Sequence, residues 1–293
     1  MNIVLRALRK AVLITLGRER VENFIKLIAK YFSIDILVVA YQENGILNYE
    51  TQVLSGEHFV ISQVLPRLLK GITSPVIFDV GSNVGEVSID LRNTFPSARI
   101  WAFEPNPVTF DQLSKNVFGQ DVSCQNIGLG SEATEGKLYC YSTNKQSGHA
   151  SMYRDVFQLY QNYGIKESSD LTEFSFLVST VDAFCAQHSI AHIDFLKIDV
   201  EGNELSVLKG AMQLITANQV PVIQFEFTDC NVMSKTFFRD FYQLLPHYQF
   251  YRLKQSGLLP LGKYQARHEI FQFQNVLAVH NDLADQVKDL TAK

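Results

Sequence analysis

Two neighbouring segments carry residues suited to binding a nucleoside. Residues 76–85 form an apolar stretch typical of a β-strand, followed by a glycine-hinged turn, Gly81-Ser-Asn-Val-Gly85. Residues 99–106 form a second apolar stretch that ends on a carboxylate, Glu104. A glycine turn lets a ligand approach the backbone, and an acid at the next strand end accepts hydrogen bonds from ribose hydroxyls. The pair predicts a nucleoside site.

Two nucleoside ligands use turns of this kind, NAD(P) and S-adenosylmethionine. A dinucleotide turn has a middle glycine where this chain has Asn83, and Glu86 at the start of the next helix would repel a pyrophosphate. S-adenosylmethionine has no phosphate, and its ammonium and carboxylate suit Asp79 and the amides of the turn. The charge pattern therefore favours S-adenosylmethionine, and an NAD-dependent oxidoreductase is the alternative.

We expect three groups of cofactor-binding residues, one for each part of the ligand: the ribose, the adenine and the methionine. The ribose diol is assigned to Glu104, with Pro105 and Asn106 beside it, and the adenine to Asn126 and Ile127 at the end of the third strand. The methionine part is assigned to the first strand end and its turn, namely Asp79, Gly81, Ser82, Asn83 and Gly85.

A second group of acids follows two later apolar segments. Asp199 and Glu201 lie in residues 195–202, and Glu226 ends the next predicted strand. Open α/β sheets bind ligands at the carboxyl ends of their strands, and buried charges are costly unless paired, so we predict catalytic roles for these three acids. Alternation along the strand puts Lys197 on the same side, where we expect it to form a structural ion pair. The acids either remove a proton from an acceptor hydroxyl or bind Mg²⁺, which lowers the hydroxyl's pKa.

Composition narrows the class of protein. The 293 residues include 46% hydrophobic and 19% charged residues, as in ordinary globular domains, and the net charge of −4 does not suggest a nucleic-acid partner. The four cysteines are scattered without a C-x-x-C pair, so we expect no metal site built on them, no disulfide framework and a reducing, cytoplasmic location. No apolar run reaches the length of a membrane span.

The first thirty residues differ from the rest. They hold seven Lys or Arg against two Glu, a net charge of +5, and their apolar residues recur at helical spacing. Such a basic amphipathic helix lies on an anionic membrane surface, on its own domain, or on a second subunit in a homo-oligomer. A non-catalytic module that docks through these residues is a further alternative.

The elements that must position these residues are predicted from hydrophobic pattern. From residue 76 onward strands alternate with helices, as in a mostly parallel sheet, and strands over 250–253 and 271–279 are expected to pair antiparallel. The helices include ones over 203–216 and 234–245, and two further extended pieces are expected over 137–141 and 174–178. Asn44-Gly45 lies between apolar runs and predicts a hairpin of strands 34–41 and 46–51. We therefore divide the chain into residues 1–55, basic helices and a hairpin, and residues 56–293. Residues 142–171 form a long loop, a candidate lid that carries His149.

The motifs taken together resemble the FkbM-type methyltransferase family. The most specific is Leu196-Lys-Ile-Asp-Val-Glu-Gly-Asn-Glu204, and the others are Phe78-Asp-Val-Gly-Ser-Asn-Val-Gly85, Ala102-Phe-Glu-Pro-Asn-Pro107, Thr180-Val-Asp182, Leu208-Lys-Gly-Ala211 and Asn275-Val-Leu-Ala-Val279. The resemblance spans roughly residues 55–280. It implies an S-adenosylmethionine-dependent O-methyltransferase with a class I Rossmann-like fold and a seven-stranded sheet, acting on a hydroxyl of a sugar, glycan or secondary metabolite.

The chain departs from the family pattern at two places. The family often has alanine where Ser82 stands, which is a mild change, and often has histidine after the acid of the fifth strand, where this chain has Glu226-Phe-Thr228. The second departure indicates a different acceptor.

Overall fold

The computed structural model describes residues 7, 11, 14–15, 17–141, 150–157 and 171–291. Its centre is an eight-stranded sheet with the order β10-β9-β11-β8-β7-β1-β2-β3. The five strands from β8 to β3 pair parallel, and β11, β9 and β10 pair antiparallel, as the sequence predicted for the last strands. The eighth strand, β10, adds to the seven that were expected. The bounds are β1 Val76–Val80, β2 Arg99–Phe103, β3 Val122–Gln125, β7 Phe195–Ile198, β8 Val222–Phe227, β9 Tyr248–Lys254, β10 Gly257–Pro260 and β11 Gln274–His280.

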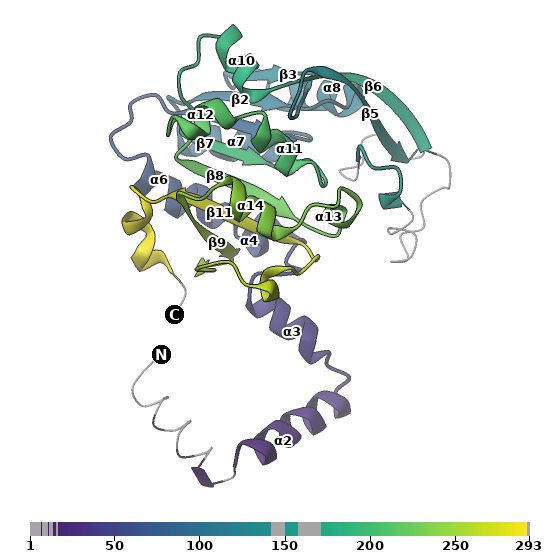
Figure 1. Cartoon of the computed structure of the whole chain (residues 1–293), viewed down its shortest axis with the longest axis vertical. Helices are drawn as coiled ribbons and strands as arrows, with labels where there is room; N and C mark the ends of the chain where they lie inside the picture. Colours follow the sequence, from purple (N-terminus) through teal and green to yellow (C-terminus); the bar gives the residue numbers. More distant parts are fainter. Residues whose placement is uncertain are drawn as a thin grey trace.

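Helices cover both faces of this sheet (Figure 1). The central strands β1, β7 and β8 are buried along their whole length, which explains their continuous apolar sequences. One face packs against α10 Val181–Gln187, α11 Glu204–Lys209, α12 Met212–Thr216 and α14 Phe238–Leu244. The other packs against η1 Val60–Val64, α6 Leu65–Leu68, α7 Glu86–Thr94 and η3 Ala284–Leu290, with α8 Pro107–Asn116 over β2 and β3.

Two predicted helices differ in the structure. The helix expected over 203–216 is interrupted at Gly210, whose backbone lies so close to the Gly130 carbonyl that no side chain would fit. The Asp182 carboxylate accepts from the Gln213 and Leu214 amides and so caps the second piece. The helix expected over 234–245 starts later, as α14, and a separate short helix that was not predicted, α13 Cys230–Met233, precedes it. Tertiary packing overrides the apolar periodicity at both places.

A smaller sheet lies beside the first. It contains β4 Gly128–Leu129, β6 Leu171–Ser179 and β5 Thr134–Tyr141, in that order. The predicted extended pieces at 137–141 and 174–178 are therefore confirmed as parts of longer strands. Most of the predicted lid, including His149, lies outside the described residues.

The predicted hairpin at residues 34–51 is wrong, because the first of its strands is a helix, α3 Ile36–Glu43. The Asp35 side chain caps it by accepting from the Leu37 and Val38 amides. Asn-Gly ends the helix instead of turning a hairpin: the Ile46 N–H donates to the Tyr41 carbonyl and the Gly45 N–H to the Gln42 carbonyl, with Gly45 at φ 77°. This Schellman motif uses the same glycine that a hairpin would.

The chain before residue 45 extends away from the body of the molecule (Figure 1). It contains α2 Arg18–Tyr31 and α3, and the body begins at Ile46, which is fully buried. Short helices α4 Gln52–Ser55 and α5 Glu57–Phe59 follow, and η2 Ala266–His268 lies near the other end of the chain. None of the helices in the described part of the chain combines the length and apolarity needed to cross a membrane.

Gly81 is required by a close backbone approach, and replacing it tests the turn. A Cβ at Gly81, where φ is 81°, would overlap the Asp199 carbonyl, whereas a Cβ at Gly119, where φ is 77°, would meet nothing. We expect Gly81→Ala to lower the urea-unfolding free energy by about 3 kcal/mol or more, and Gly119→Ala by only about 1 kcal/mol, the cost of the left-handed backbone. Equal losses would contradict this role of Gly81.

Candidate functional site

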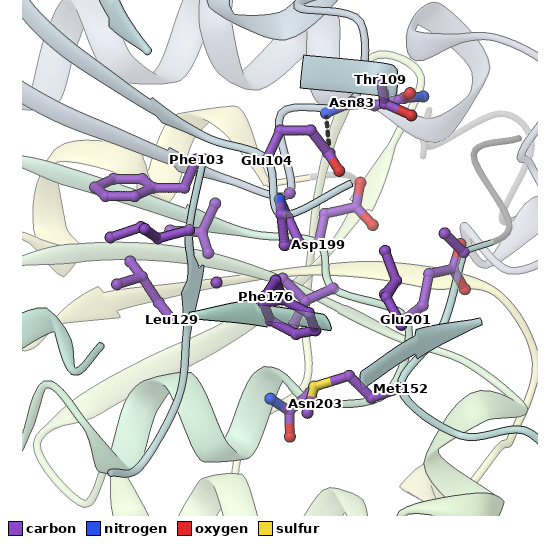
Figure 2. A pocket seen from close by; sticks show the side chains of 18 of the residues that line it. Asn83, Phe103, Glu104, Thr109, Leu129, Met152, Phe176, Asp199, Glu201 and Asn203 are labelled. Carbon is purple, nitrogen blue, oxygen red and sulfur yellow. Dashed lines mark hydrogen bonds between the residues drawn. The ribbon is translucent and has the colours of Figure 1, made fainter. Parts of the chain in front are cut away.

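A cavity lies where β1, β2, β7 and β8 end, at the carboxyl edge of the sheet (Figure 2). Open α/β sheets bind ligands at this edge. Its lining combines turn residues, an apolar wall and carboxylates. The lining residues are Val80, Gly81, Asn83, Phe103, Glu104, Pro105, Thr109, Ile127, Gly128, Leu129, Leu138, Ala150, Met152, Phe176, Asp199, Val200, Glu201, Asn203 and Glu226.

The Glu104 carboxylate is held by two backbone amides. The Asn83 N–H donates to one oxygen at 3.0 Å and the Asn106 N–H to the other at 2.8 Å. Burial raises the pKa of Glu104 to about 7, although these two hydrogen bonds oppose the shift. Each oxygen still has a lone pair for a further donor, so the group suits a pair of hydroxyls.

The amides of the glycine turn are used inside the protein. Those of Gly81 and Ser82 both donate to the Phe103 carbonyl, at 3.0 Å each, and the Ser82 hydroxyl donates to the Asp79 carbonyl. The Asn83 amide donates to the Glu104 carboxylate, as described above, and the Gly85 amide donates to the Ser82 carbonyl. The turn therefore gives the cavity its shape, but its amides at these four positions are not free to bind an anion.

Two buried polar atoms near the site lack a hydrogen-bond partner among the described residues. They are Asp79 Oδ1, from a side chain with no exposed surface, and the Thr109 hydroxyl, which lines the cavity. Buried polar groups are nearly always paired, so such atoms call for a ligand or solvent molecule. Asp79 Oδ2 is occupied, because the Ser88 hydroxyl donates to it at 2.6 Å. Asp79 Oδ1 lies 3.7 Å from the Lys197 ammonium, which compensates its charge, and Asp79 does not line the cavity. The Thr109 hydroxyl does line it and can form a hydrogen bond with a ligand there.

A single ammonium, Lys197, lies among three carboxylates beneath the cavity. Its Nζ is 3.0 Å from Asp199, 3.7 Å from Asp79 and 4.0 Å from Glu57. Burial alone would lower the pKa of Lys197, but these carboxylates outweigh it and raise the pKa. The expected pairing with one acid is thus confirmed and extended to three.

Glu57 was missed in the sequence because nothing near it signals a partner. Its carboxylate accepts from the Gln224 side chain at 3.1 Å and from the Ser55 hydroxyl at 3.1 Å. Burial raises the pKa of Glu57, and Lys197 opposes the shift. The residue connects α5 to the middle of the large sheet.

The three predicted catalytic acids all line the cavity, although not on one strand. β7 ends at Ile198, and Glu201 reaches the cavity from a turn with φ 54°, so the expected alternation stops at Asp199. The Cys230 thiol donates to a Glu201 oxygen at 3.3 Å. Burial raises the pKa of Glu226 well above its usual range. The nearby negative charges raise it further, and they belong to Asp199, Glu201, Glu204 and Glu57.

Glu204 has a structural role beside this group. Its Oε1 accepts from the amides of Val200 and Gly202 at 3.1 and 3.0 Å, which closes the turn that carries Glu201. Burial raises the pKa of Glu204 to about 7 against those hydrogen bonds.

The remaining predicted cofactor residues divide into lining and supporting positions. Ile127 and Pro105 line the cavity together with Phe103 and Leu129, which were not predicted and form an apolar wall. Asn126 is exposed, and its amide donates to the carbonyls of Glu104 and Pro105, which fastens the turn after β2. Four more predicted residues, Asp79, Ser82, Gly85 and Asn106, support the walls and do not line the cavity.

The opposite wall comes in part from the predicted lid, which contributes Ala150 and Met152, and in part from two residues that were not predicted, Leu138 and Phe176. It is formed by Leu138, Phe176, Ala150 and Met152, from the small sheet and the residues that follow the undescribed part of the loop. Figure 2 shows Phe176 and Met152 facing the cavity across from Glu104. The pairing of β5 with β6 places Leu138 and Phe176, and a bridge between Tyr139 and Ser151 places Ala150 and Met152.

Among the described residues, no group of three or more His, Cys, Asp or Glu side chains has the arrangement of a metal site.

The sequence matches the family model described as "Methyltransferase FkbM domain" over residues 79–252, more than half of the chain. The chain belongs to this family. The match runs from the end of β1 into β9 and therefore includes the carboxyl end of every strand that borders the cavity.

Three curated relatives of this FkbM-family chain show how far the likeness reaches. It is 30% identical to "Methyltransferase sdnD" of Sordaria araneosa over 47% of this chain and 61% of that one. It is 27% identical to "Hexuronic acid methyltransferase AglP" of Haloferax volcanii, over 58% and 63%. It is 28% identical to "31-O-demethyl-FK506 methyltransferase FkbM" of Streptomyces tacrolimicus, over 55% and 68%. The chain thus spans about three fifths of the length of the first relatives it matches.

Among solved structures, the FkbM-family chain is similar to an O-methyltransferase from Bacillus cereus in complex with SAH. The identity is 13%, the TM-score is 0.40, and the match covers 93% of this chain and 97% of that one.

Removing the buried ammonium tests whether it holds the acids together. We expect Lys197→Met to lower the unfolding free energy by about 3 to 5 kcal/mol near neutral pH, because Asp79, which has no exposed surface, would lose its cation. Because the loss comes from uncompensated negative charge, it is expected to shrink as the pH falls.

Lys137→Met is the matched control, since Lys137 pairs with Glu173 on the surface and its loss is expected to leave the unfolding curve unchanged. Similar curves for the two variants would contradict the role of Lys197.

Proposed function

We propose that this chain transfers a methyl group from S-adenosylmethionine to a hydroxyl of a sugar, glycan or related secondary metabolite. The observation that carries the proposal is the Glu104 carboxylate, fixed by two amides at the end of β2 and facing a cavity with an apolar wall. In an α/β sheet an acid at this position binds the ribose diol of a nucleoside. Family membership and the Thr109 hydroxyl, which lines the cavity without a hydrogen-bond partner among the described residues, support the same cofactor.

The NAD alternative is less well supported. A pyrophosphate needs free amides at a helix N-terminus, and the amides of Gly81, Ser82 and Asn83 already donate within the protein. Glu86 at the start of α7 adds a negative charge at the same place.

S-adenosylmethionine, when bound, supplies an electrophilic methyl group. The chain's own residues must then orient an acceptor hydroxyl and take its proton. We assign proton removal to Glu226, because a carboxyl group whose pKa burial has raised is a stronger base. Asp199, held by Lys197, and Glu201 are assigned to hydrogen bonds that orient the acceptor.

The charge of the cavity favours a neutral acceptor. Asp199, Glu201 and Glu226 all line it, and the nearby Lys197 ammonium already forms ion pairs with three carboxylates. An acid-lined cavity repels a carboxylate, so we propose a neutral polyhydroxyl acceptor in place of the hexuronic acid named for one relative.

The pH dependence of cofactor binding tests the role of Glu104. Ionised Glu104 accepts hydrogen bonds from ribose hydroxyls and protonated Glu104 accepts fewer, so affinity must rise with pH through its pKa of about 7. We expect calorimetric affinity for S-adenosylhomocysteine to rise about tenfold from about pH 6 to about pH 8, and Glu104→Gln to bind more weakly with a flat profile.

The same titration with NAD is the control for the alternative. NAD binding without any response to S-adenosylhomocysteine would overturn the proposal, and an unchanged pH profile in Glu104→Gln would contradict the ribose assignment.

Replacing Glu226 tests the proton acceptor. We expect Glu226→Gln to lower kcat for methyl transfer about 100-fold or more, since the amide cannot take a proton, while the affinity for S-adenosylhomocysteine changes little. Glu132→Gln, on an exposed residue, is the matched control. Running the assay with EDTA and with Mg²⁺ separates the two roles considered for these acids, because activity that requires Mg²⁺ would favour metal binding.

A further inference from the structure

The segment from residue 17 to residue 44, here called the arm, presents an apolar surface that the rest of the described chain does not cover. Eleven of the eighteen large apolar side chains that are exposed in the described residues belong to positions 14–39. Phe24 is 62% exposed, Leu27 65% and Leu37 59%, and α3 has no buried residue at all. Apolar surface gathered on this scale marks an interaction site.

The apolar residues of α2 share one side of the helix. Val21, Phe24, Ile25 and Ile28 recur at spacings of three and four, which places them on one face. Lys26 and Lys30 lie on the opposite face, and the paired Arg18 and Glu22 lie at the side, between the two faces. The helix is therefore amphipathic, with basic residues on its polar side.

The arm is fastened at its base. Arg252, only 5% exposed, donates from Nε to the Gln274 side chain at 2.8 Å and from a terminal nitrogen to the Asn44 carbonyl at 3.4 Å. The Leu47 amide donates to the Phe273 carbonyl, and a side chain at Gly45 would overlap the Leu253 carbonyl. The body thus holds the end of α3 while the arm extends away from it (Figure 1), so whatever covers the apolar face comes from outside this body.

We propose that the arm docks the protein on the surface of an anionic lipid bilayer. The first thirty residues carry +5, and because the whole chain carries −4, the remaining residues carry −9. Within the arm the positive charge lies on α2, which has four Lys or Arg against two Glu, a net charge of +2, whereas Asp35 and Glu43 lie at the ends of α3. A second copy would bring another positively charged α2 against the first, whereas anionic headgroups attract it. A bilayer surface also accepts the apolar face, so it supplies the two attractions that stable peripheral binding needs.

Flotation of the full chain with vesicles tests this proposal. We expect the protein to float with phosphatidylcholine vesicles that contain about a third phosphatidylglycerol, to float far less with phosphatidylcholine alone, and to be released by high salt. Lys26→Glu with Lys30→Glu is expected to weaken binding roughly tenfold or more, and Phe24→Ser with Ile28→Ser by a similar factor.

Matched controls come from the body of the molecule. Phe118→Ser removes a side chain that is 88% exposed, and Lys70→Glu reverses an exposed charge, and both are expected to bind like the unaltered chain. Because the arm's side chains are exposed, circular dichroism is expected to show all four variants folded.

Two results would overturn the proposal. One is equal flotation by the arm variants and the body controls. The other is absence of vesicle binding together with a dimer, measured by light scattering, that the Phe24 and Ile28 substitutions dissociate, since a second copy would then be the partner.

Discussion

The buried ammonium of Lys197 is the interaction on which the site depends. It sits on β7 opposite Asp79 of β1 in the register of the two strands, and it also contacts Asp199 and Glu57. Burying a charge is expensive, and the burial of Lys197 and Asp79 is tolerable only because opposite signs lie together. Lys197 therefore lets acids accumulate at the middle of the sheet, and it ties the segment before β1 to the cavity through Glu57.

Two backbone features turn this edge of the sheet into a cavity with defined chemistry. The turn at Gly81 passes so close to the Asp199 carbonyl that no side chain fits between them. The amides of Asn83 and Asn106 fix the Glu104 carboxylate. Backbone groups thus fix the Gly81 turn and the Glu104 carboxylate. The cost of burying Glu104 is reflected in its raised pKa.

Sequence reasoning succeeded where a residue's role follows from its place along a strand. Glu104 and Glu226 end buried strands, so their convergence on one edge follows from the direction of parallel strands. Reasoning failed at Asn44-Gly45, because a glycine with positive φ suits both a hairpin and a helix end, and the cap supplied by Asp35 decided between them. The prediction that Glu201 continues the strand was also wrong. Glu201 lies in a turn, and the amides on either side of it donate to the Glu204 carboxylate of the following helix.

The sequence by itself determined the parallel sheet, the antiparallel end, the family and the main acids, because hydrophobic period and strand-end positions are local properties. Only the tertiary structure decided which distant groups meet them. The pairing of Glu57 with Lys197, the apolar wall from β5 and β6, and the loss of free amides in the glycine turn all depend on contacts between segments far apart in the chain. No local pattern encodes such contacts, since each requires the folded register of several strands at once.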